Sequence, residues 1–300
     1  MPDKLVIGFV PSREASALVD TIQPIADYLS QQLGIPVEGY VSTDYTAMVT
    51  ALQTGQAQIA ALAPFTIVQA VDNGSSELIL TSERYGSGSY HTQFMTNNPD
   101  RYCTISPPVE NERTSEVNPG TFLNCNGTDR GPTDTPKGPI GTSVLSNIPT
   151  GTTVSFVEES SSSGYIFPIT ILKNAGIDID NGIQKMFAGG HDASAIAVCE
   201  GQAEVGVAFD DARSEALSDC DLNNKVVVFA YGDEIPNDGV VVAADLPAQL
   251  KADIKQALID YSKTEAGATI LKTVYNITAF TEPNIDALQI VRDAAAAVPQ

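Results

Sequence analysis

Short buried strands alternate with amphipathic helices along most of this 300-residue chain. In its first part, runs of apolar and β-branched residues at 5–10, 37–41 and 59–62 predict strands, and helical apolar spacing predicts helices that end near 33 and 52. The joints are short and often contain Gly or Pro. This alternation predicts an α/β protein whose parallel sheet is covered by helices on both faces.

Four consecutive serines, Ser160–Ser163, stand where one of these strands turns into a helix. The run 152–157 predicts the strand, and apolar residues at helical spacing up to Gly176 predict the helix. The first helical turn has four N–H groups without intrahelical partners, and the helix dipole places partial positive charge there. Hydroxyl donors beside those amides form an oxyanion receptor that needs no Lys or Arg. A serine cap in a polar loop is the competing interpretation.

The net charge of −21 argues against nucleic acid as a partner. The acidic residues are dispersed along the chain, so a solvated surface explains most of them. At physiological salt the Debye length is about 8 Å, so distant carboxylates are largely screened and local donors decide whether an anion binds. No run approaches the roughly 18 apolar residues of a membrane-spanning helix.

The cysteines are Cys103, Cys125, Cys199 and Cys220, and their spacing, with only two histidines in the chain, does not predict a metal site. We favour pairing of sequence neighbours, Cys103 with Cys125 and Cys199 with Cys220, over the other pairings; four reduced thiols are the alternative. Disulfides would indicate an oxidising compartment, periplasmic or at the cell surface. A signal or lipoprotein peptide would then have been removed from the start of this sequence.

A stretch rich in Pro, Gly, Asn and Thr, residues 97–138, interrupts the alternation and predicts a surface excursion, pinned by its own disulfide. The alternation then resumes, and the last part of the chain is expected to return to the first lobe. The expected domains are lobe 1, from 1–95 plus 239–300, and lobe 2, from 96–238 with the insert. A ligand cleft is expected between the lobes, at the carboxyl ends of the strands.

Further polar segments follow predicted strands or open predicted helices: Asp44-Tyr45, Gly189-Gly190-His191-Asp192-Ala193-Ser194, Phe209-Asp210-Asp211-Ala212-Arg213 and Ile235-Pro236-Asn237-Asp238-Gly239. Together with Ser161-Ser162-Ser163-Gly164-Tyr165, this order resembles the phosphate/phosphite/phosphonate substrate-binding proteins of ABC importers. The resemblance runs from Leu5 to about Leu271 without the insert. A further matching piece is Gly201-Gln202-Ala203-Glu204-Val205.

The resemblance implies a type II periplasmic-binding-protein fold, with two α/β lobes, a hinge and an interlobe cleft. It also implies a set of ligand-binding residues: Tyr45, Tyr90, Ser161, Ser162, Ser163, His191, Asp211 and Asp238. In this set the serines, the amides beneath them, His191 and the Tyr45 hydroxyl would hold the phosphonate oxygens, and Tyr90 matches another pocket tyrosine. Asp211 and Asp238 would face the ammonium group of an aminophosphonate.

The expected function is that of an extracytoplasmic solute-binding protein that captures a phosphonate, above all an aminophosphonate such as 2-aminoethylphosphonate, and delivers it to a membrane ABC permease. Binding of phosphate, phosphite or another small anion is the alternative. A pocket for a flat heterocycle is disfavoured because the chain has no Trp. No enzyme, cofactor or metal is expected: Ser162-Ser163-Gly164-Tyr165 lacks the leading Gly of a hydrolase elbow, and Asp192 adjoins His191 too closely for a triad.

Overall fold

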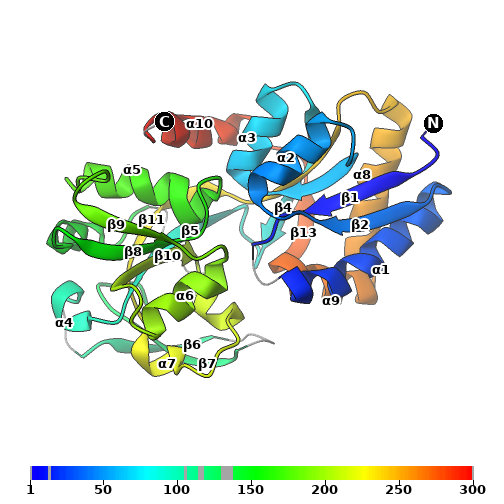
Figure 1. The fold of residues 1–300 in the computed structure, drawn as a ribbon. Coiled ribbons are helices and arrows are strands. Elements are labelled where there is room, and N and C mark those ends of the chain that lie inside the picture. The colour runs from blue at the N-terminus through cyan, green and yellow to red at the C-terminus, as the bar shows by residue number, and fades with distance from the viewer. Residues whose placement is uncertain (1, 13–14, 105–106, 114–117, 130–137, 299–300) are drawn as a thin grey trace. The chain divides into compact units, whose positions relative to one another are not determined.

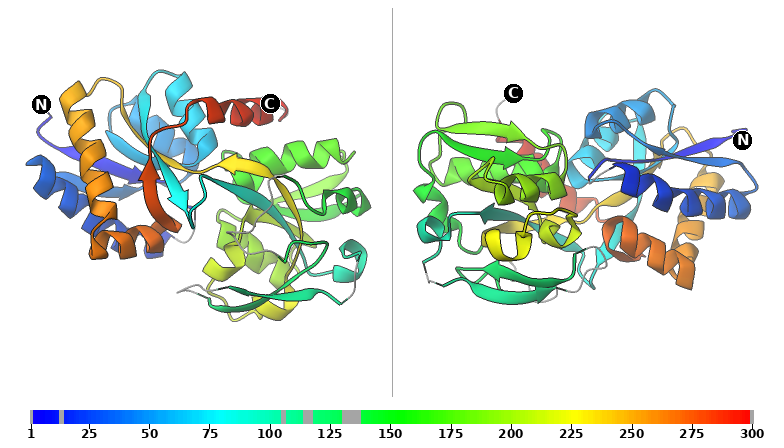
Figure 2. Two further views of the ribbon diagram at one scale, coloured as in Figure 1. Left: turned by 180° about the vertical axis from the view of Figure 1, so that it is seen from behind. Right: turned by 60° about the horizontal axis from the view of Figure 1, so that its bottom comes forward.

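The computed structural model divides the chain into two compact units, each built around its own sheet (Figures 1 and 2). It describes residues 2–12, 15–104, 107–113, 118–129 and 138–298. Unit 1 comprises Met1–Ser89 and Pro236–Arg292, and unit 2 comprises Tyr90–Ile235 and Asp293–Gln300. The chain therefore passes from the first unit into the second and returns.

The unit boundaries differ from the expected lobes at three places: near 89, near 236 and near 292. Unit 1 resumes at Pro236 instead of at 239, so Asp238 belongs to unit 1. Strand β5 (Ser89–Thr96) hydrogen-bonds within the second sheet, so unit 1 ends at Ser89 instead of at 95. Helix α10 (Gln289–Ala296) begins in unit 1, and its last residues belong to unit 2. Hydrogen bonds from Thr170 to the carbonyl of Ala294 and from Lys173 to that of Ala297 attach this end within unit 2.

The sheet of unit 1 is mixed, whereas the sequence predicted a parallel one. Its strand order is β13 (Ile277–Thr281), β4 (Ser76–Arg84), β12 (Gly239–Ala243), β3 (Ile59–Leu62), β1 (Leu5–Phe9), β2 (Val37–Val41). Strands β2, β1 and β3 are parallel, as the strand–helix alternation predicts. Strand β12 is antiparallel to β3 and β4, and β13 is antiparallel to β4.

Helices cover both faces of the unit 1 sheet. They are α1 (Ala15–Leu33), α2 (Tyr45–Gln53), α3 (Pro64–Asp72), α8 (Ala248–Ser262) and α9 (Glu265–Tyr275), with a short 3₁₀ turn (Asp286–Leu288) before α10. Ile7 and Phe9 join a core cluster with residues of α1, α8 and α9. Gly8, which lies between them, faces Met48 of α2, and a Cβ there would overlap the Met48 side chain. The two faces of β1 thus carry different helices, as side-chain alternation along a strand requires.

The sheet of unit 2 is also mixed. Its order is β6 (Val109–Arg113), β7 (Gly120–Asn124), β11 (Val227–Pro236), β5, β10 (Val205–Phe209), β8 (Thr152–Phe156), β9 (Ile183–Phe187). Strands β10, β8 and β9 are parallel, β5 is antiparallel to β10, and β7 is parallel to β11. The parallel part again corresponds to the strand–helix alternation of the sequence.

Unit 2 also has helices on both faces of its sheet (Figure 1). Its helical segments are α4 (Pro99–Tyr102), a 3₁₀ turn (Thr142–Asn147), a π turn (Ser162–Ile166) that continues as α5 (Phe167–Asn174), α6 (His191–Cys199), a 3₁₀ turn (Ala212–Glu215) and α7 (Leu222–Lys225). Tyr231 belongs to a core cluster with Ala195 and Val198 of α6. The next residue, Gly232, faces Ile171 of α5, so α5 and α6 cover opposite faces.

The insert contains regular structure, which the sequence analysis did not predict. Within 97–138, residues 105–106, 114–117 and 130–137 lie outside the described part. The described part includes the antiparallel pair β6–β7, which extends the sheet through β11. Phe122 of β7 is fully buried. Single strands this short carry too few apolar residues for their periodicity to be visible in a polar segment.

Two disulfides confirm the favoured pairing, Cys103 with Cys125 and Cys199 with Cys220. Their Cα atoms are 5.5 and 6.2 Å apart. The first bridge lies within the insert and joins the residue after α4 to the residue after β7. The second joins the end of α6 to the segment before α7. Among the helices of the described ranges, none combines the length and hydropathy needed to span a membrane.

Candidate functional site

Several segments of unit 2 meet at one edge of its sheet. Strands β8, β9 and β10 are parallel neighbours, so they end together at Phe156, Phe187 and Phe209. Strand β5 runs in the opposite direction and pairs Thr92 with Phe209, so its first residues lie at the same edge. The segments that follow the three phenylalanines therefore come together with the start of β5.

The serine turn, which we define as Ser160–Ser163, follows β8 at this edge and is buried. The hydroxyl oxygen of Ser161 accepts a hydrogen bond from the N–H of Gly164 at 3.2 Å. The carbonyl of Ser161 accepts from the N–H groups of both Tyr165 and Ile166, each at 3.0 Å. The second of these bonds spans five residues and produces the π turn that leads into α5. The Ser161 hydroxyl is thus held at the start of a helix, where the sequence predicted it.

Gly164 allows the serine turn to pack closely against the end of β8. A Cβ at Gly164 would lie 2.5 Å from Cβ of Val157 and 2.7 Å from the hydroxyl oxygen of Ser161. The N–H of Val157 donates to the carbonyl of Gly164 at 3.1 Å, and the hydroxyl of Thr92 donates to the carbonyl of Ser163 at 3.1 Å. Strands β8 and β5 therefore fix the turn from two sides.

His191 is the first residue of α6 and follows β9 at the same edge. The residue is 4% exposed. The ring atom Nε2 lies 3.4 Å from the hydroxyl oxygen of Ser161, and Nδ1 lies 3.1 Å from the backbone nitrogen of Phe209. The imidazole also packs on the Phe209 ring, with the ring centroids 4.7 Å apart. His191 thereby connects the serine turn to the end of β10.

This arrangement is chemically suited to an anion. Ser161 places its hydroxyl at the start of the helix, and the Gly164 N–H and Nε2 of His191 lie within hydrogen-bonding distance of that hydroxyl oxygen. Hydroxyl and N–H donors directed at an oxyanion form charge-assisted hydrogen bonds, each worth about 1.5–3 kcal/mol. The helix dipole adds partial positive charge at the same place.

Tyr45 and Asp238, two other predicted ligand residues, belong to unit 1. Tyr45 opens α2 and is buried; the preceding Asp44 caps the helix, accepting from the N–H of Ala47 at 2.6 Å. Asp238 directly precedes β12, whose first residue, Gly239, pairs with the last residue of β3. Both residues therefore stand at the edge of the unit 1 sheet where its parallel strands end. Tyr90 belongs to unit 2 and lies near the start of β5.

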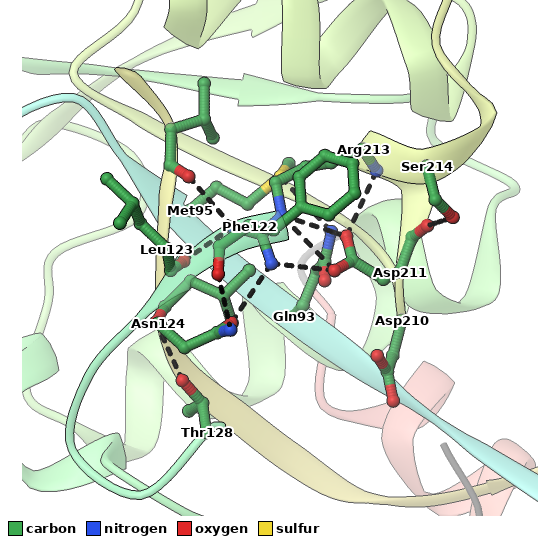
Figure 3. Close-up of polar contacts among 12 residues, drawn as sticks. Gln93, Met95, Phe122, Leu123, Asn124, Thr128, Asp210, Asp211, Arg213 and Ser214 are labelled. Atoms are coloured by element: carbon green, nitrogen blue, oxygen red, sulfur yellow. Dashed lines mark hydrogen bonds and ion pairs between the residues drawn. The ribbon is translucent and has the colours of Figure 1, made fainter. Parts of the chain in front are cut away.

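The carboxylate of Asp211 is engaged by Arg213, two residues further along the chain (Figure 3). Nη2 of Arg213 lies 2.7 Å from Oδ2 of Asp211, and Nε lies 3.0 Å from Oδ1. The same guanidinium donates to the carbonyls of Leu123 and Val226, at 2.6 and 2.8 Å, and to the Asn124 side chain at 3.0 Å. The Asp211 and Arg213 side chains are 2% and 0% exposed. Arg213 stands in a segment that the sequence singles out, but its pairing with Asp211 was not predicted, although the Asp-x-Arg spacing is visible.

Asp238 also has an arginine partner. Its carboxylate forms an ion pair with Arg84 at the end of β4. Its carbonyl accepts from the N–H and the hydroxyl of Ser82, at 2.8 and 2.9 Å. Burial raises the pKa of the Asp238 carboxyl, and the charge of Arg84 opposes part of this rise. No local pattern in the sequence indicates this pair, because its members come from distant parts of the chain. Asp211 and Asp238, the two predicted ammonium ligands, therefore both interact with guanidinium groups of the protein.

Comparison with known proteins shows which family the chain matches. The model of a family described as "ABC transporter, phosphonate, periplasmic substrate-binding protein" matches residues 7–288. A curated relative, the phosphate-import protein PhnD of Mycolicibacterium smegmatis, is 25% identical in an alignment of 228 residues that covers 73% of this chain. The chain spans 59% of the length of that relative.

Solved structures show the same fold. PhnD1 from Prochlorococcus marinus, in complex with methylphosphonate, superimposes with a TM-score of 0.77 at 19% identity, covering 99% of this chain and 98% of its own. A binding protein component of an ABC phosphonate transporter from Pseudomonas aeruginosa gives a TM-score of 0.75 at 16% identity, covering 98% and 86%. These matches confirm the type II periplasmic-binding-protein fold that the resemblance implied.

Proposed function

Because the chain belongs to the family of periplasmic substrate-binding proteins of phosphonate ABC transporters, we propose that it binds a phosphonate or a closely related tetrahedral oxyanion and delivers it to a membrane permease. The relatives are binding proteins of importers, so the prediction that the chain is not an enzyme is confirmed. The identity of the ligand and the delivery step are the proposed parts.

The observation that carries the proposal is the buried serine turn beside His191. Its donors, the Ser161 hydroxyl among them, are neutral groups gathered at a helix start. A tetrahedral oxyanion presents several oxygens to one side and can accept from several of these groups together. We propose Tyr45 and Tyr90 as further ligand contacts. Each lies at the sheet edge of its own unit where the parallel strands end, and this position supports the proposal.

The expected preference for an aminophosphonate depended on Asp211 and Asp238. Each of these carboxylates forms an ion pair with an arginine of its own unit. A ligand ammonium would have to compete with a guanidinium that is already in place. We therefore propose a ligand that needs no ammonium group, such as methylphosphonate, and use 2-aminoethylphosphonate as the contrasting ligand.

We further propose that the protein works outside the cytoplasm, where its two disulfides would persist. Removal of a signal or lipoprotein peptide belongs to this proposal. Mass spectrometry of the protein produced from its full gene in its own cells would show whether the chain is processed and lipid-modified. A protein recovered from the cytoplasm with reduced cysteines would contradict it.

Calorimetry tests the binding proposal. The ligands are phosphate, phosphite, methylphosphonate and 2-aminoethylphosphonate, each titrated into the protein and into two variants. Ser161→Ala should weaken the binding of every oxyanion by about 5- to 150-fold, since it removes a donor worth about 1–3 kcal/mol. Ser146→Ala, at an exposed serine of the same unit, is the matched control and should bind like the parent protein.

Two outcomes would overturn the proposal. One is the absence of heat with all four ligands. The other is a Ser161→Ala variant that binds as tightly as the Ser146→Ala control, because the serine turn would then have no part in binding.

A further inference from the structure

The contacts of His191 identify which of its ring nitrogens carries hydrogen. Its Nδ1 atom lies 3.1 Å from the backbone nitrogen of Phe209. A backbone N–H can only donate, so Nδ1 must accept, and the hydrogen of a neutral imidazole is then on Nε2. We infer that His191 works as the neutral Nε2–H tautomer, and that Phe209 is the positioning residue that holds it there.

The end of β10 keeps the Phe209 amide in place. Phe209 pairs with Thr92 of β5, and its own ring packs against the imidazole. If the imidazole turned over, a ring carbon would replace Nδ1 and the Phe209 N–H would lose its acceptor inside a buried site. Loss of a buried hydrogen bond is costly, so the sheet selects one orientation of the ring.

This orientation decides what the serine turn can offer to a ligand. The hydroxyl oxygen of Ser161 lies 3.4 Å from Nε2 of His191 and accepts from the N–H of Gly164. Both lone pairs of Ser161 then face donors, so its hydroxyl hydrogen must point to another acceptor. The Ser161 hydroxyl can therefore act only as a donor towards a ligand. The inference thus rests on the proposed function and deepens it: the ligand oxygen bound here is an unprotonated oxygen of the oxyanion, not a P–OH group.

The other histidine provides a built-in contrast. Nδ1 of His91 lies 2.8 Å from the carbonyl oxygen of Gly232. A carbonyl can only accept, so His91 must carry its hydrogen on Nδ1 when it is neutral. The chain contains two histidines in total, and their contacts assign opposite tautomers. Both rings are buried in unit 2.

Nitrogen-15 NMR of the imidazole groups in the ligand-free protein tests the inference directly. A His191→Gln variant identifies which set of signals belongs to His191. The expected result is a neutral Nε2–H ring for His191 and an Nδ1–H ring for His91. An Nδ1–H or a doubly protonated ring at His191 would overturn the inference. This measurement needs no ligand. Its result therefore tests the tautomer of His191 even if no oxyanion binds to the protein.

Binding measurements with methylphosphonate then separate a donor from a structural role. His191→Gln keeps a side-chain N–H in reach of the serine turn, whereas His191→Phe keeps only the ring volume. The Gln variant should bind at least 10-fold more tightly than the Phe variant, with both folded by circular dichroism. Equal affinities of the two would contradict the donor role of His191.

Discussion

Arg213 stands two residues after Asp211, and the two side chains form a buried, two-pronged ion pair in unit 2. Figure 3 shows the guanidinium between Asp211 and the β7 residues Leu123 and Asn124, while the Asp210 carboxylate points away from it. The pair therefore attaches the insert to the segment that follows β10. It also gives the Asp211 carboxylate a structural task.

Arg213→Met is expected to lower the free energy of unfolding by about 3–5 kcal/mol, because it leaves the Asp211 carboxylate buried without its counter-charge. Chemical denaturation followed by circular dichroism measures this change. The control is Lys4→Met at the exposed Lys4–Glu38 pair, which should change stability by less than about 1 kcal/mol. An equally small effect of Arg213→Met would mean that the buried pair has no such role.

Asp211→Ala should weaken methylphosphonate and 2-aminoethylphosphonate binding to a similar extent, if it weakens either. The reason is that the Asp211 carboxylate already accepts hydrogen bonds from Arg213, so we do not expect it to bind a ligand ammonium. Calorimetry with both ligands checks this expectation. A loss confined to 2-aminoethylphosphonate would restore the ammonium contact that the sequence suggested.

Gly164→Ala should reduce oxyanion affinity by at least about 10-fold, since an added Cβ would push the serine turn away from Val157 or displace the Ser161 hydroxyl. Calorimetry with methylphosphonate measures the effect. At Gly88 an added Cβ meets open space, so Gly88→Ala is the matched control and should bind normally. Unchanged binding by Gly164→Ala would show that the close packing of the turn is not required.

Removing the Cys199–Cys220 bridge by a double Cys→Ser substitution should lower the free energy of unfolding by about 3 kcal/mol, because a loop of this length no longer restricts the unfolded chain. Denaturation curves with and without a reducing agent give the measurement. The parent protein should lose stability in the reducing agent. The stability of a variant that lacks both bridges should not change in the reducing agent. If the stability of the parent protein did not change either, the bridges would contribute nothing to stability.

Asp72 should make a small, pH-dependent contribution to stability. The hydrogen bond from Arg292 lowers the pKa of the Asp72 carboxyl below its ordinary value of 3.8. A lowered folded-state pKa contributes stability above the ordinary pKa, and this is lost as the pH falls through the lowered value. Because the pair is partly exposed, Asp72→Asn should cost less than about 1 kcal/mol at pH 7. Chemical denaturation of the parent protein and of Asp72→Asn at pH 7 and in acid measures this contribution. The stability difference between the two proteins should vanish in acid. A difference that is the same at both pH values would contradict the predicted pH dependence.

Local patterns in the sequence determined much of the fold and the centre of the site. Periodicity located the parallel strands and their helices, because each element buries its own apolar face. The run Ser161-Ser162-Ser163-Gly164 could be assigned to a helix start, because the strand and the helix that flank it are both visible in the chain. The disulfide pairing followed from sequence proximity, and the structure has that pairing.

Tertiary structure alone decided the direction of β12 and β13, the pairing of the insert strands with β11, and the partners of the two aspartates. Strand direction and edge pairing depend on where the chain re-enters a sheet, which a local pattern does not contain. Arg84 and Asp238 are 154 positions apart in sequence and meet because β4 and β12 are neighbours. Arg213 is only two residues from Asp211 in sequence, but its orientation depends on the carbonyls of Leu123 and Val226. A buried carboxylate pairs with the guanidinium that lies beside it in the folded protein. Which residue this is depends on three-dimensional packing and not on the local sequence.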